Sequence, residues 1–594
     1  MGDKENIFDV GIIGCGPRGL SALESLYTSV GRGDSIPKTL IIEKSNYPGA
    51  GPIYSLDQPN TNWLNVSERG LDIWPRKTAK LDKINIDGFP DFQDWSGYSR
   101  KDVSPENVDH FPFRSEMGKY LTHRFESIAN ILVREGFLEF VQGEADRIDI
   151  ENNLVKVHTI GGDNYLVHEA ALCIGHQPIT LDSQLSGWQS RGLELDNIEL
   201  FTQPYPIDRL LSSAETFHDR KVAIRGFGLA MIDVARAYTE GMGGEFRILD
   251  SSSRKMEYHA SGHEPNEILT FSLDGLPMAP KPVNKKLDKL YVPSEKQLKN
   301  YSDKVKDSLL AGPNSTEFLI TAISPIISRK FMELGDNGHE HYLSEPEINE
   351  LICSWLRNGE FAHELIVSKN LSAKDVLQQF SGMATGHEPV SLDYCIGHVW
   401  RHVQPTMYEL LSFVDISDEL ISAVVQLDER LKRYSYGPPV DSLRQLLALV
   451  RSGHLNLDFV KDPNIILEEE GYVFEHDGER KIVQTMVNSV LDSPQILKVA
   501  ATLPKGLINS ADIEPLHDKL GLRTNEDALI QKTDGSSIPI AIMGRLAKGT
   551  LIGVDAIAEC FGKRSGLWAE VFMKRFLERE RESIPVTKNV EDSL

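Results

Sequence analysis

The stretch FDVGIIGCGPRGLSALESL, from Phe8 to Leu26, decides the first part of the fold. Its opening residues, up to Ile13, are mostly apolar, which is typical of a buried parallel strand. A G-x-G-x-x-G turn follows, and the residues after it have apolar side chains at helical spacing and no proline. The residues of the turn are Gly14, Gly16, Pro17, Arg18 and Gly19. The stretch therefore predicts a strand, a glycine turn and a helix, which is how a dinucleotide-binding unit begins.

An acidic residue follows at the distance that such a unit requires. The next apolar segment, TLIIEKS, contains Glu43 and Lys44, and Glu43 comes 24 residues after Gly19. A dinucleotide-binding unit places an acidic residue here, against the ribose hydroxyls of the adenosine. The glycines let the backbone approach a pyrophosphate, and the helix N-terminus favours its negative charge. The alternative is a plain βαβ turn without a ligand, but the strand, glycines, helix and acidic residue all favour a dinucleotide.

The segment after Glu43 favours FAD over a nicotinamide cofactor. It reads KSNYPGAGPIYSLDQPNTNWLNVSERG and shows no helical pattern. A domain that binds NAD alone usually returns to a helix at this point, whereas a long loop suits a ligand that extends past its pyrophosphate. We therefore predict that this loop covers the ribityl chain and the flavin ring, with Tyr54, Trp63 and Asn65 near the ring. An ordinary surface loop is the alternative.

A second glycine turn lies far downstream, in RKVAIRGFGLAMIDVARAYTEG, residues 220–241. Gly226 and Gly228 again stand between an apolar strand and an amphipathic helix, but Met231 replaces the third glycine. This degenerate pattern predicts a second Rossmann-like unit for NAD(P)H. The alternative is a unit that packs against its neighbours and binds no nucleotide.

The residues after the second turn leave the choice between NADH and NADPH open. The strand EFRILD ends at Asp250, 22 residues after Gly228, and Asp250 suits an unphosphorylated ribose. Ser252 and Arg254 follow directly and suit a 2′-phosphate.

Composition excludes several classes of protein. The chain has 594 residues and a net charge of -24, which argues against a nucleic-acid-binding protein. No apolar run approaches the roughly 18 residues of a membrane span, and the N-terminus lacks the pattern of a signal peptide. The five cysteines are scattered without a C-x-x-C pair. We expect a cytoplasmic protein without a nucleic-acid or membrane partner and without a metal site, and the oligomeric state stays open.

Taken together, the segments VGIIGCGPRGLSALE and VAIRGFGLAMIDVAR resemble the FAD/NAD(P)-binding flavoproteins with two dinucleotide-binding domains. These are relatives of the flavin-dependent monooxygenases, including N-hydroxylating ones that act on amino acids and diamines. FPFRSEMGKYLTHRF resembles the Arg-x-x-x-Gly-x-Tyr-Leu segment of this family, and LEFVQGEADRIDI, which contains Ala145, resembles the strand after it. AALCIGHQP is similar to the strand that ends in Ala-Thr-Gly in the family, with Ile174 in place of threonine.

The resemblance extends to a closing segment near the C-terminus. AIMGRLAKGTLIGVDAIAECFG is similar to the strand and Gly-x-Asp that meet the ribityl chain and pyrophosphate in the family, here Gly553 and Asp555. The resemblance covers residues 5–285 and 500–575. The candidate cofactor-binding residues are Gly14, Gly16, Pro17, Arg18, Gly19, Glu43, Lys44, Tyr54, Trp63, Asn65, Ala145, Gly226, Gly228, Arg254, Gly553 and Asp555.

The fold class that follows is α/β, with two Rossmann-like dinucleotide-binding domains, one nested in the other, plus a largely helical insertion. We expect the FAD-binding domain at residues 5–205 and 496–575 and the NAD(P)-binding domain at 206–285. Apolar residues at helical spacing predict a helical insertion or cap at 286–495, a natural source of substrate contacts. Residues 576–594 are expected to form a flexible tail.

The resemblance implies an FAD-dependent oxidoreductase, specifically an NAD(P)H-dependent monooxygenase that acts on a small molecule such as an amine or amino acid. Two other classes stay open. One is a flavin-dependent oxidase or dehydrogenase without oxygen transfer, and the other is a non-enzymatic sensor that binds a flavin or nucleotide.

Three further groups of residues carry less weight. His398 and His402 stand at i and i+4 without the glutamate of a metalloprotease. The segment YHASGHEPNE, with His259, His263 and Glu264, is best explained as a hydrogen-bonded loop. Cys15 has no second cysteine close by in the sequence and is expected to be a buried thiol.

Overall fold

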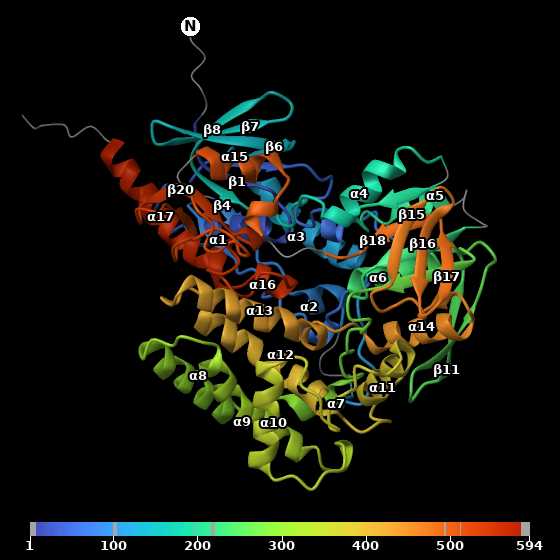
Figure 1. The fold of residues 1–594 in the computed structure, drawn as a ribbon. Helices are drawn as coiled ribbons and strands as arrows, with labels where there is room; N and C mark the ends of the chain where they lie inside the picture. The colour runs from blue at the N-terminus through green and yellow to red at the C-terminus, as the bar shows by residue number, and fades with distance from the viewer. Residues whose placement is uncertain are drawn as a thin grey trace, which may run out of the picture.

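The computed structural model describes residues 7–82, 84–98, 104–196, 198–214, 220–491, 495–510 and 513–583. In Figure 1 the strands of a first sheet, with β1 and β8, lie at the top beside α1 and α17. Strands β15, β16 and β17 lie at the right, and helices α8, α9 and α10 form the lower part. Within the described residues, no helix combines the length and the apolar character needed to cross a membrane.

The first sheet contains parallel strands in the order β20-β8-β1-β2-β5. Their bounds are β1 (Ile7–Ile13), β2 (Thr39–Glu43), β5 (Leu138–Gln142), β8 (Asn164–Leu172) and β20 (Ser537–Ile542). β19 (Leu529–Gln531) pairs antiparallel with β20, and the hairpin of β6 (Ala145–Glu151) and β7 (Leu154–Thr159) pairs antiparallel with β8. Both faces of β1 are covered, which explains why its sequence is almost continuously apolar.

Helices cover one face of this sheet. They are α1 (Pro17–Thr28), α3 (Arg114–Arg134) and α17 (Lys563–Ser583), while α15 (Thr502–Ser510) packs on β6 at the other face. α1 begins directly after the glycine turn, with Gly16 as its N-cap and Pro17 as its first residue. Proline suits this position because the first amide of a helix has no partner within the helix. Leu20 and Leu23 of α1 share a core with Trp568 of α17.

The second sheet is entirely parallel, in the order β14-β13-β10-β18-β9. Its strands are β9 (Glu199–Phe201), β10 (Lys221–Arg225), β13 (Glu267–Phe271), β14 (Leu455–Asn456) and β18 (Thr485–Asn488). α6 (Leu229–Ala237) follows β10 and the second glycine turn. Two smaller antiparallel sheets accompany it: β11 (Glu245–Asp250) with β12 (Lys255–His259), and β15 (Asn464–Glu468) with β16 (Gly471–His476) and β17 (Glu479–Val483).

The chain nests one unit inside another. It leaves the first sheet after β8, builds the second sheet, and returns to the first sheet at β19 and β20. The second sheet is itself interrupted between β13 and β14 by a long helical segment. The predicted fold class, two nested dinucleotide-binding units with a helical insertion, is confirmed.

The helices of this insertion share one apolar core with the second sheet. Their bounds are α7 (Lys285–Asp288), α8 (Glu295–Leu310), α9 (Glu317–Glu333), α10 (Glu345–Arg357), α11 (Ala373–Thr385), α12 (Leu392–Leu411), α13 (Asp418–Ser435) and α14 (Val440–Arg451). Serine hydroxyls cap several of them by accepting first-turn amides, as Ser294, Ser372 and Ser417 do. The remaining short elements are β3 (Ala79–Leu81), β4 (Ile84–Ile86), α2 (Phe92–Ser96), α4 (Ser183–Gly192), α5 (Asp208–Ala214) and α16 (Ile557–Cys560).

Three expectations about the chain need correction. The range expected to be helical, 286–495, holds helices only as far as α14, and strands β14 to β18 follow it. These strands are short, so they leave little periodic signal in the sequence. The second sheet therefore takes β9, β14 and β18 from outside 206–285. The expected tail, 576–594, is helical up to Ser583 with Phe576 buried, and residues 584–594 lie outside the described residues.

Candidate functional site

The glycines of the first turn differ in what surrounds them. Gly14 has a positive φ of 86°, and a Cβ there would lie 2.8 Å from the carbonyl oxygen of Cys173. A Cβ on Gly19 would collide with the carbonyl oxygen of Gly14. A Cβ on Gly16 would meet no protein atom closer than the Cα of Gly51, at 3.8 Å. The outer glycines are thus needed for chain packing, whereas the middle one keeps the backbone accessible, as a pyrophosphate requires.

Arg18 links this turn to the closing segment of the same domain. Its guanidinium donates to the carbonyl oxygens of Val554 at 2.6 Å, Met543 at 3.1 Å and Glu559 at 3.3 Å. Among the described residues, no carboxylate lies within ion-pair distance of it. A pyrophosphate at the turn would supply the missing negative charge, so Arg18 and the open Gly16 fit the phosphates of FAD.

Three further candidate cofactor-binding residues, Glu43, Lys44 and Ala145, lie at the end of β2 and the start of β6. Buried Glu43 accepts hydrogen bonds from the backbone amides of Cys15 and of Ser45, the latter at 2.7 Å. Lys44 pairs with Glu144 at 3.1 Å on the surface, and Ala145 begins β6 directly after it. The end of β2 and the start of β6 therefore lie together, so the structure brings the candidate residues Lys44 and Ala145 close to each other.

Cys15 has neighbours in space that it lacks in sequence. Cys173 follows β8 and touches the glycine turn, and its proximity contributes to the raised pKa of Cys15. Burial raises the pKa of the Cys15 thiol well above its usual range and that of Cys173 to about 12. Both thiols are therefore protonated at neutral pH, which agrees with buried, unreactive cysteines.

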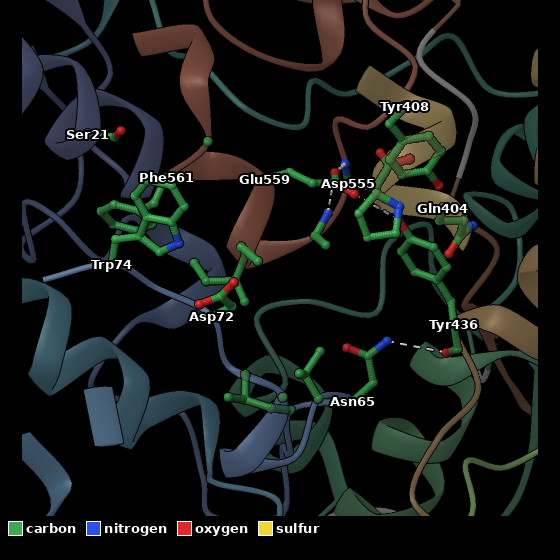
Figure 2. A pocket seen from close by; sticks show the side chains of 18 of the residues that line it. Ser21, Asn65, Asp72, Trp74, Gln404, Tyr408, Tyr436, Asp555, Glu559 and Phe561 are labelled. Atoms are coloured by element: carbon green, nitrogen blue, oxygen red, sulfur yellow. Dashed lines mark hydrogen bonds between the residues drawn. The ribbon is translucent and has the colours of Figure 1, made fainter. Parts of the chain in front are cut away.

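A cavity of about 950 Å³ lies where the domains meet (Figure 2). It takes residues from the first domain, from α6 of the second domain and from the helical insertion. The residues that line it include Tyr54, Asn65, Leu229, Lys281, Arg401, Gln404, Tyr408, Tyr436, Asp555 and Glu559. In Figure 2, Asn65 and Tyr436 lie together on one side of the cavity, and Trp74 and Phe561 lie on the other.

Three residues of the loop after β2 were predicted near the flavin ring, and two of them line the cavity. Tyr54 ends a short 3-10 turn (Pro52–Tyr54) and lines the cavity, as does Asn65, whose side chain donates to the carbonyl oxygen of Tyr436 at 3.3 Å. Trp63 is not among the cavity residues. Its ring is covered by the guanidinium of Arg236, 3.8 Å from the ring centroid, so it joins the first domain to α6.

Gly118 of α3 sets the position of Tyr54. A Cβ on Gly118 would collide with the Tyr54 carbonyl oxygen and would lie 3.0 Å from Leu56 Cδ1. We expect Gly118→Ala to lower the free energy of unfolding by about 1–3 kcal/mol through overpacking, as measured by urea denaturation. Gly187→Ala is the matched control, because Gly187 also lies inside a helix but, among the described residues outside its own helical turns, no atom lies within 4 Å of its Cβ position. Equal stability of the two variants would contradict the close packing of α3 against the loop.

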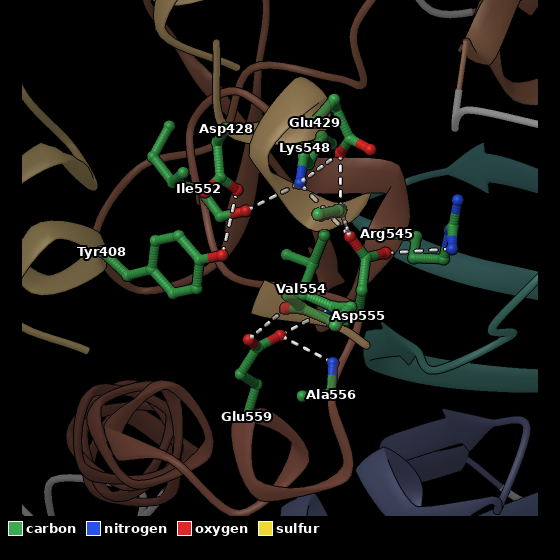
Figure 3. Close-up of polar contacts among 12 residues, drawn as sticks. Tyr408, Asp428, Glu429, Arg545, Lys548, Ile552, Val554, Asp555, Ala556 and Glu559 are labelled. Atoms are coloured by element: carbon green, nitrogen blue, oxygen red, sulfur yellow. Dashed lines mark hydrogen bonds and ion pairs between the residues drawn. The ribbon is translucent and has the colours of Figure 1, made fainter. Parts of the chain in front are cut away.

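Asp555 lies in a cluster of charges rather than alone (Figure 3). It forms ion pairs with Lys432 at 2.5 Å, Arg545 at 2.9 Å and Lys548 at 3.3 Å. Burial opposes ionisation, but these cations together hold the pKa of Asp555 well below its usual range. The carboxylate is therefore charged and fixed at the cavity wall, where it can accept hydrogen bonds from a ribityl hydroxyl.

Gly553 is required by the packing of α12 on the first domain. A Cβ there would collide with the ring of Tyr408 from α12, so its lack of a side chain lets the helical insertion pack on the first domain. Tyr408 in turn donates to Asp428 at 2.9 Å. Glu559, one turn after Asp555, accepts the amides of Asp555 at 2.5 Å and of Ala556 at 2.9 Å.

One face of α12 also forms part of the cavity wall. Arg401, Gln404 and Tyr408 stand at i, i+3 and i+7, so they share one side of the helix. Arg401 pairs with the buried Asp288, which also pairs with Arg69 at 2.9 Å. Burial raises the pKa of Asp288, but Arg401, His402 and Arg69 together hold it well below its usual range.

Lys281 is a cation of another kind. Its ammonium donates to the carbonyl oxygens of Asn65 and of Gly437, the latter at 3.0 Å, and no carboxylate among the described residues pairs with it. Removal from bulk water, reinforced by Arg401 and Arg69 and opposed by Asp288, lowers the pKa of Lys281 to about 7.

This pKa makes stability depend on pH. We expect the free energy of unfolding of the wild type to rise, relative to that of Lys281→Met, as the pH increases from about 7 toward 10.5. The unfolded chain binds this proton up to its ordinary pKa of 10.5, whereas the folded protein releases it near 7, so withdrawal of protons favours folding. Urea denaturation at several pH values measures the difference, which can change by at most about 1.4 kcal/mol per pH unit. A difference independent of pH would contradict the lowered pKa.

The second glycine turn also opens toward the cavity. Gly226 has a φ of 117°, and a Cβ there would lie 2.7 Å from Ser489 Oγ. Gly228 caps α6, and its Cβ would meet only Met278 Sδ, at 3.9 Å. Leu229, the next residue, lines the cavity. As at the first turn, one glycine is required by packing and another leaves the backbone accessible.

Asp250 and Arg254, which were predicted to determine the preference for NADH or NADPH, do not lie where the sequence predicted. β11, which ends at Asp250, pairs only with β12, so it is not the next strand of the parallel sheet. The strands beside β10 are β13 and β18, and Asp274 follows the carboxyl end of β13, where Arg433 binds it. Arg254 forms a two-point contact with Asp441, with Nε 2.7 Å from the carboxylate. An inserted hairpin thus moves Asp250 away from the position that its spacing predicted.

The histidine groups take structural positions. His402 contacts Asp288 at 3.1 Å, and His398 is fully buried beside the ring of Tyr394. Glu264 accepts hydrogen bonds from the Tyr258 hydroxyl and from the amides of Ser261 and Gly262, which is the predicted hydrogen-bonded loop. In the part of the chain that the structure describes, no group of three or more potential ligands could hold a metal ion.

The main residues that sequence reasoning missed belong to the helical insertion. Lys281, Arg401, Tyr408 and Tyr436 come from three separate segments, and no motif connects them. Lys281 alone has a local signal, because Pro280 and Pro282 flank it and restrict the backbone to an extended form.

Two nested parallel sheets, each with a glycine turn at the start of a helix, define a protein with two dinucleotide-binding domains. Residues 11–177 match the family described as FAD-NAD(P)-binding. The predicted resemblance and the predicted cofactors, FAD and NAD(P)H, are thereby confirmed.

One curated relative has a name that states its product. The nitrosuccinic acid synthase npaA of Aspergillus oryzae is 26% identical over 260 residues. The match covers 43% of this chain and 38% of that protein, so it spans well under half the length of the relative.

Solved structures of similar arrangement share little sequence. A cyclohexanone monooxygenase mutant from Rhodococcus sp. Phi1, bound to NADP+, is 12% identical with a TM-score of 0.44, covering 98% of this chain and 87% of that one. The bacillithiol disulfide reductase of Bacillus cereus is 12% identical with a TM-score of 0.40, covering 96% and 100%. Likeness at this level says nothing about the substrate or the reaction.

Proposed function

We propose that the protein is an FAD-dependent monooxygenase that uses NAD(P)H and acts on a small molecule. The observation that carries the proposal is the cavity, because both dinucleotide-binding domains and the helical insertion border it. Tyr54 comes from the loop after the first turn, Leu229 directly follows Gly228 of the second turn, and Tyr436 ends α13. Such an arrangement lets one cofactor, a second cofactor and a substrate meet at a domain interface.

The chain's own residues would hold the cofactor and exclude water. FAD, when bound, accepts electrons from a reduced nicotinamide and passes them to O2. Gly16 and Arg18 would hold its pyrophosphate, Glu43 its adenosine ribose, and Asp555 its ribityl chain. The α12 face with Gln404 and Tyr408, together with Tyr436, would cover this region on the side of the helical insertion. In the overall reaction one oxygen atom of O2 enters the substrate and the other leaves as water, with two electrons from NAD(P)H.

The name of the curated relative supports a nitrogen-bearing substrate. A nitrosuccinic acid synthase makes a product that carries both nitrogen bound to oxygen and carboxylates. Since the match covers only part of either protein, an amine or amino acid as substrate of this chain is a proposal. Cytoplasmic localisation likewise stays a prediction.

Spectroscopy followed by isotope labelling tests the proposal. The purified protein is expected to show flavin absorbance. NADPH or NADH should bleach this absorbance under anaerobic conditions, and comparison of the two identifies the preferred nicotinamide. With 18O2 and a panel of amines and amino acids, one labelled atom is expected in the product. Flavin reduction followed only by hydrogen peroxide and an unlabelled product would favour an oxidase or dehydrogenase. Bound flavin that no nicotinamide reduces, even with the panel present, would favour a sensor, and protein that binds no FAD would overturn the proposal.

A further inference from the structure

The buried cations of the cavity wall are almost all neutralised by carboxylates. Arg401 and Arg69 pair with Asp288, and Arg69 also pairs with Asp109 at 2.6 Å. Arg76 and Arg124 share Glu24 at 3.0 Å and 2.7 Å, and Arg545 pairs with Asp555. Lys281 differs, because its two partners are neutral carbonyl oxygens and no carboxylate of the described residues is within ion-pair distance.

The position of Lys281 is fixed by its backbone as well as by its side chain. Its amide donates to the carbonyl oxygen of Pro438 at 3.0 Å, and the amide of Ala279 donates to the carbonyl oxygen of Arg433 at 2.9 Å. Gly437 allows this approach, because a Cβ there would collide with the carbonyl oxygen of Ala279. The strand-like segment from Ala279 to Lys281 is thus held against the end of α13, and the ammonium is presented at the cavity wall.

Lys281 also lies at the junction of the parts that form the cavity. Its ammonium donates to the carbonyl oxygen of Asn65, whose side chain donates to Tyr436. The Tyr436 hydroxyl donates to Glu559 at 3.2 Å, next to Asp555. Hydrogen bonds therefore connect the ammonium with the loop after β2 and with the closing segment of the first domain. A group bound to Lys281 would lie within the region proposed for catalysis.

An ammonium removed from water without a countercharge is unfavourable, and an incoming anion would relieve this. A carboxylate fits best, since an ammonium with two carbonyl partners has one further N–H donor to offer. Arg401 and Arg69 lie nearby but are paired with Asp288 and Asp109, so the ammonium of Lys281 is the cation that lacks a paired carboxylate here among the described residues. This unpaired ammonium favours a small anion over a neutral or cationic ligand.

We propose that Lys281 binds a carboxylate of the substrate, so that the substrate class is a small amine that also carries a carboxylate. The inference rests on the proposed function for the identity of the amine, but the anion site itself does not depend on oxygen transfer. Lys281 acts as a specificity-determining residue: it selects acidic substrates and orients them within the cavity.

Calorimetric titration of the FAD-loaded protein tests the inference without turnover. The probes are acetate, succinate and glutarate, with neutral succinamide for comparison. We expect the wild type to bind at least one of the carboxylates, and to bind succinamide about 10-fold more weakly or not at all. Lys281→Met is expected to weaken carboxylate binding about 10- to 100-fold, as loss of a charge-assisted hydrogen bond implies, and to leave FAD content unchanged.

Lys286→Met is the control, because Lys286 lies nearby in the sequence but pairs with Glu106 at the surface, with its side chain 63% exposed. It should bind the carboxylates as the wild type does. If Lys281→Met does not fold, Lys281→Gln replaces it and retains a hydrogen-bond donor without charge. Equal affinity of the wild type and the Lys281 variant, or no binding of any of the three carboxylates by the wild type, would overturn the inference. Failure of oxygen transfer with intact, Lys281-dependent carboxylate binding would instead overturn only the proposed function.

Discussion

Protein carrying Gly16→Ala is expected to fold as the wild type does but to bind FAD about 30- to 100-fold more weakly. The added methyl group meets no protein atom closer than 3.8 Å, so the fold accommodates it. The same methyl group would stand where the pyrophosphate approaches the backbone, and such a clash costs about 2–3 kcal/mol. Flavin absorbance of the purified variant, and titration of the apoprotein with FAD, measure the effect.

Gly19→Ala distinguishes loss of the ligand from loss of the fold. Its methyl group would collide with the carbonyl oxygen of Gly14, so this variant is expected to lose thermal stability even in the absence of FAD. Gly16→Ala protein should keep the melting temperature of the apoprotein. If it purifies with full flavin occupancy, the assignment of the pyrophosphate to the first turn is wrong.

Gly228→Ala is expected to slow flavin reduction by NAD(P)H about 10- to 100-fold and to leave FAD affinity unchanged. The methyl group would meet only Met278 Sδ, at 3.9 Å, so the second domain should keep its fold. It would, however, obstruct the backbone at the start of α6, where a nicotinamide dinucleotide would place its pyrophosphate. Anaerobic stopped-flow mixing with NADPH and with NADH measures the rate.

The two glycine variants serve as controls for each other. Gly16→Ala should change FAD binding, and Gly228→Ala should change only the step that depends on the nicotinamide. An unchanged reduction rate in Gly228→Ala would mean that the second Rossmann unit is structural and that electrons enter by another route.

Together the predictions separate three functions of one interface. The first turn concerns retention of FAD, the second concerns its reduction, and Lys281 concerns the choice of substrate. These sites lie in different domains but converge on the cavity bordered by Tyr54, Leu229 and Tyr436. Mutations at one site should therefore leave the measurements that report on the others largely unchanged.

The local elements of both domains could be predicted from the sequence because their determinants are contiguous. β1, the glycine turn and α1 occupy adjacent residues, and each has a distinct physical signal: a buried strand, a turn that needs glycine, and a helix with proline at its start. Glu43 is similarly fixed by the length of one helix and one strand. β10 with α6 repeats this pattern closely enough to be found despite Met231.

The sequence by itself thus determined that two dinucleotide-binding units exist, where the glycine turn of each lies, and that a helical segment follows the second turn. Only the tertiary structure decided which strands are neighbours, so that β13 rather than β11 lies beside β10 and Asp250 moves to a hairpin. It also decided that Asp555 is held by three cations and that Lys281 faces the cavity without a carboxylate partner among the described residues. The physical reason is that strand pairing and charge pairing join residues from separate segments, such as Lys432 and Asp555, and their free energy depends on distances and burial that no local pattern records.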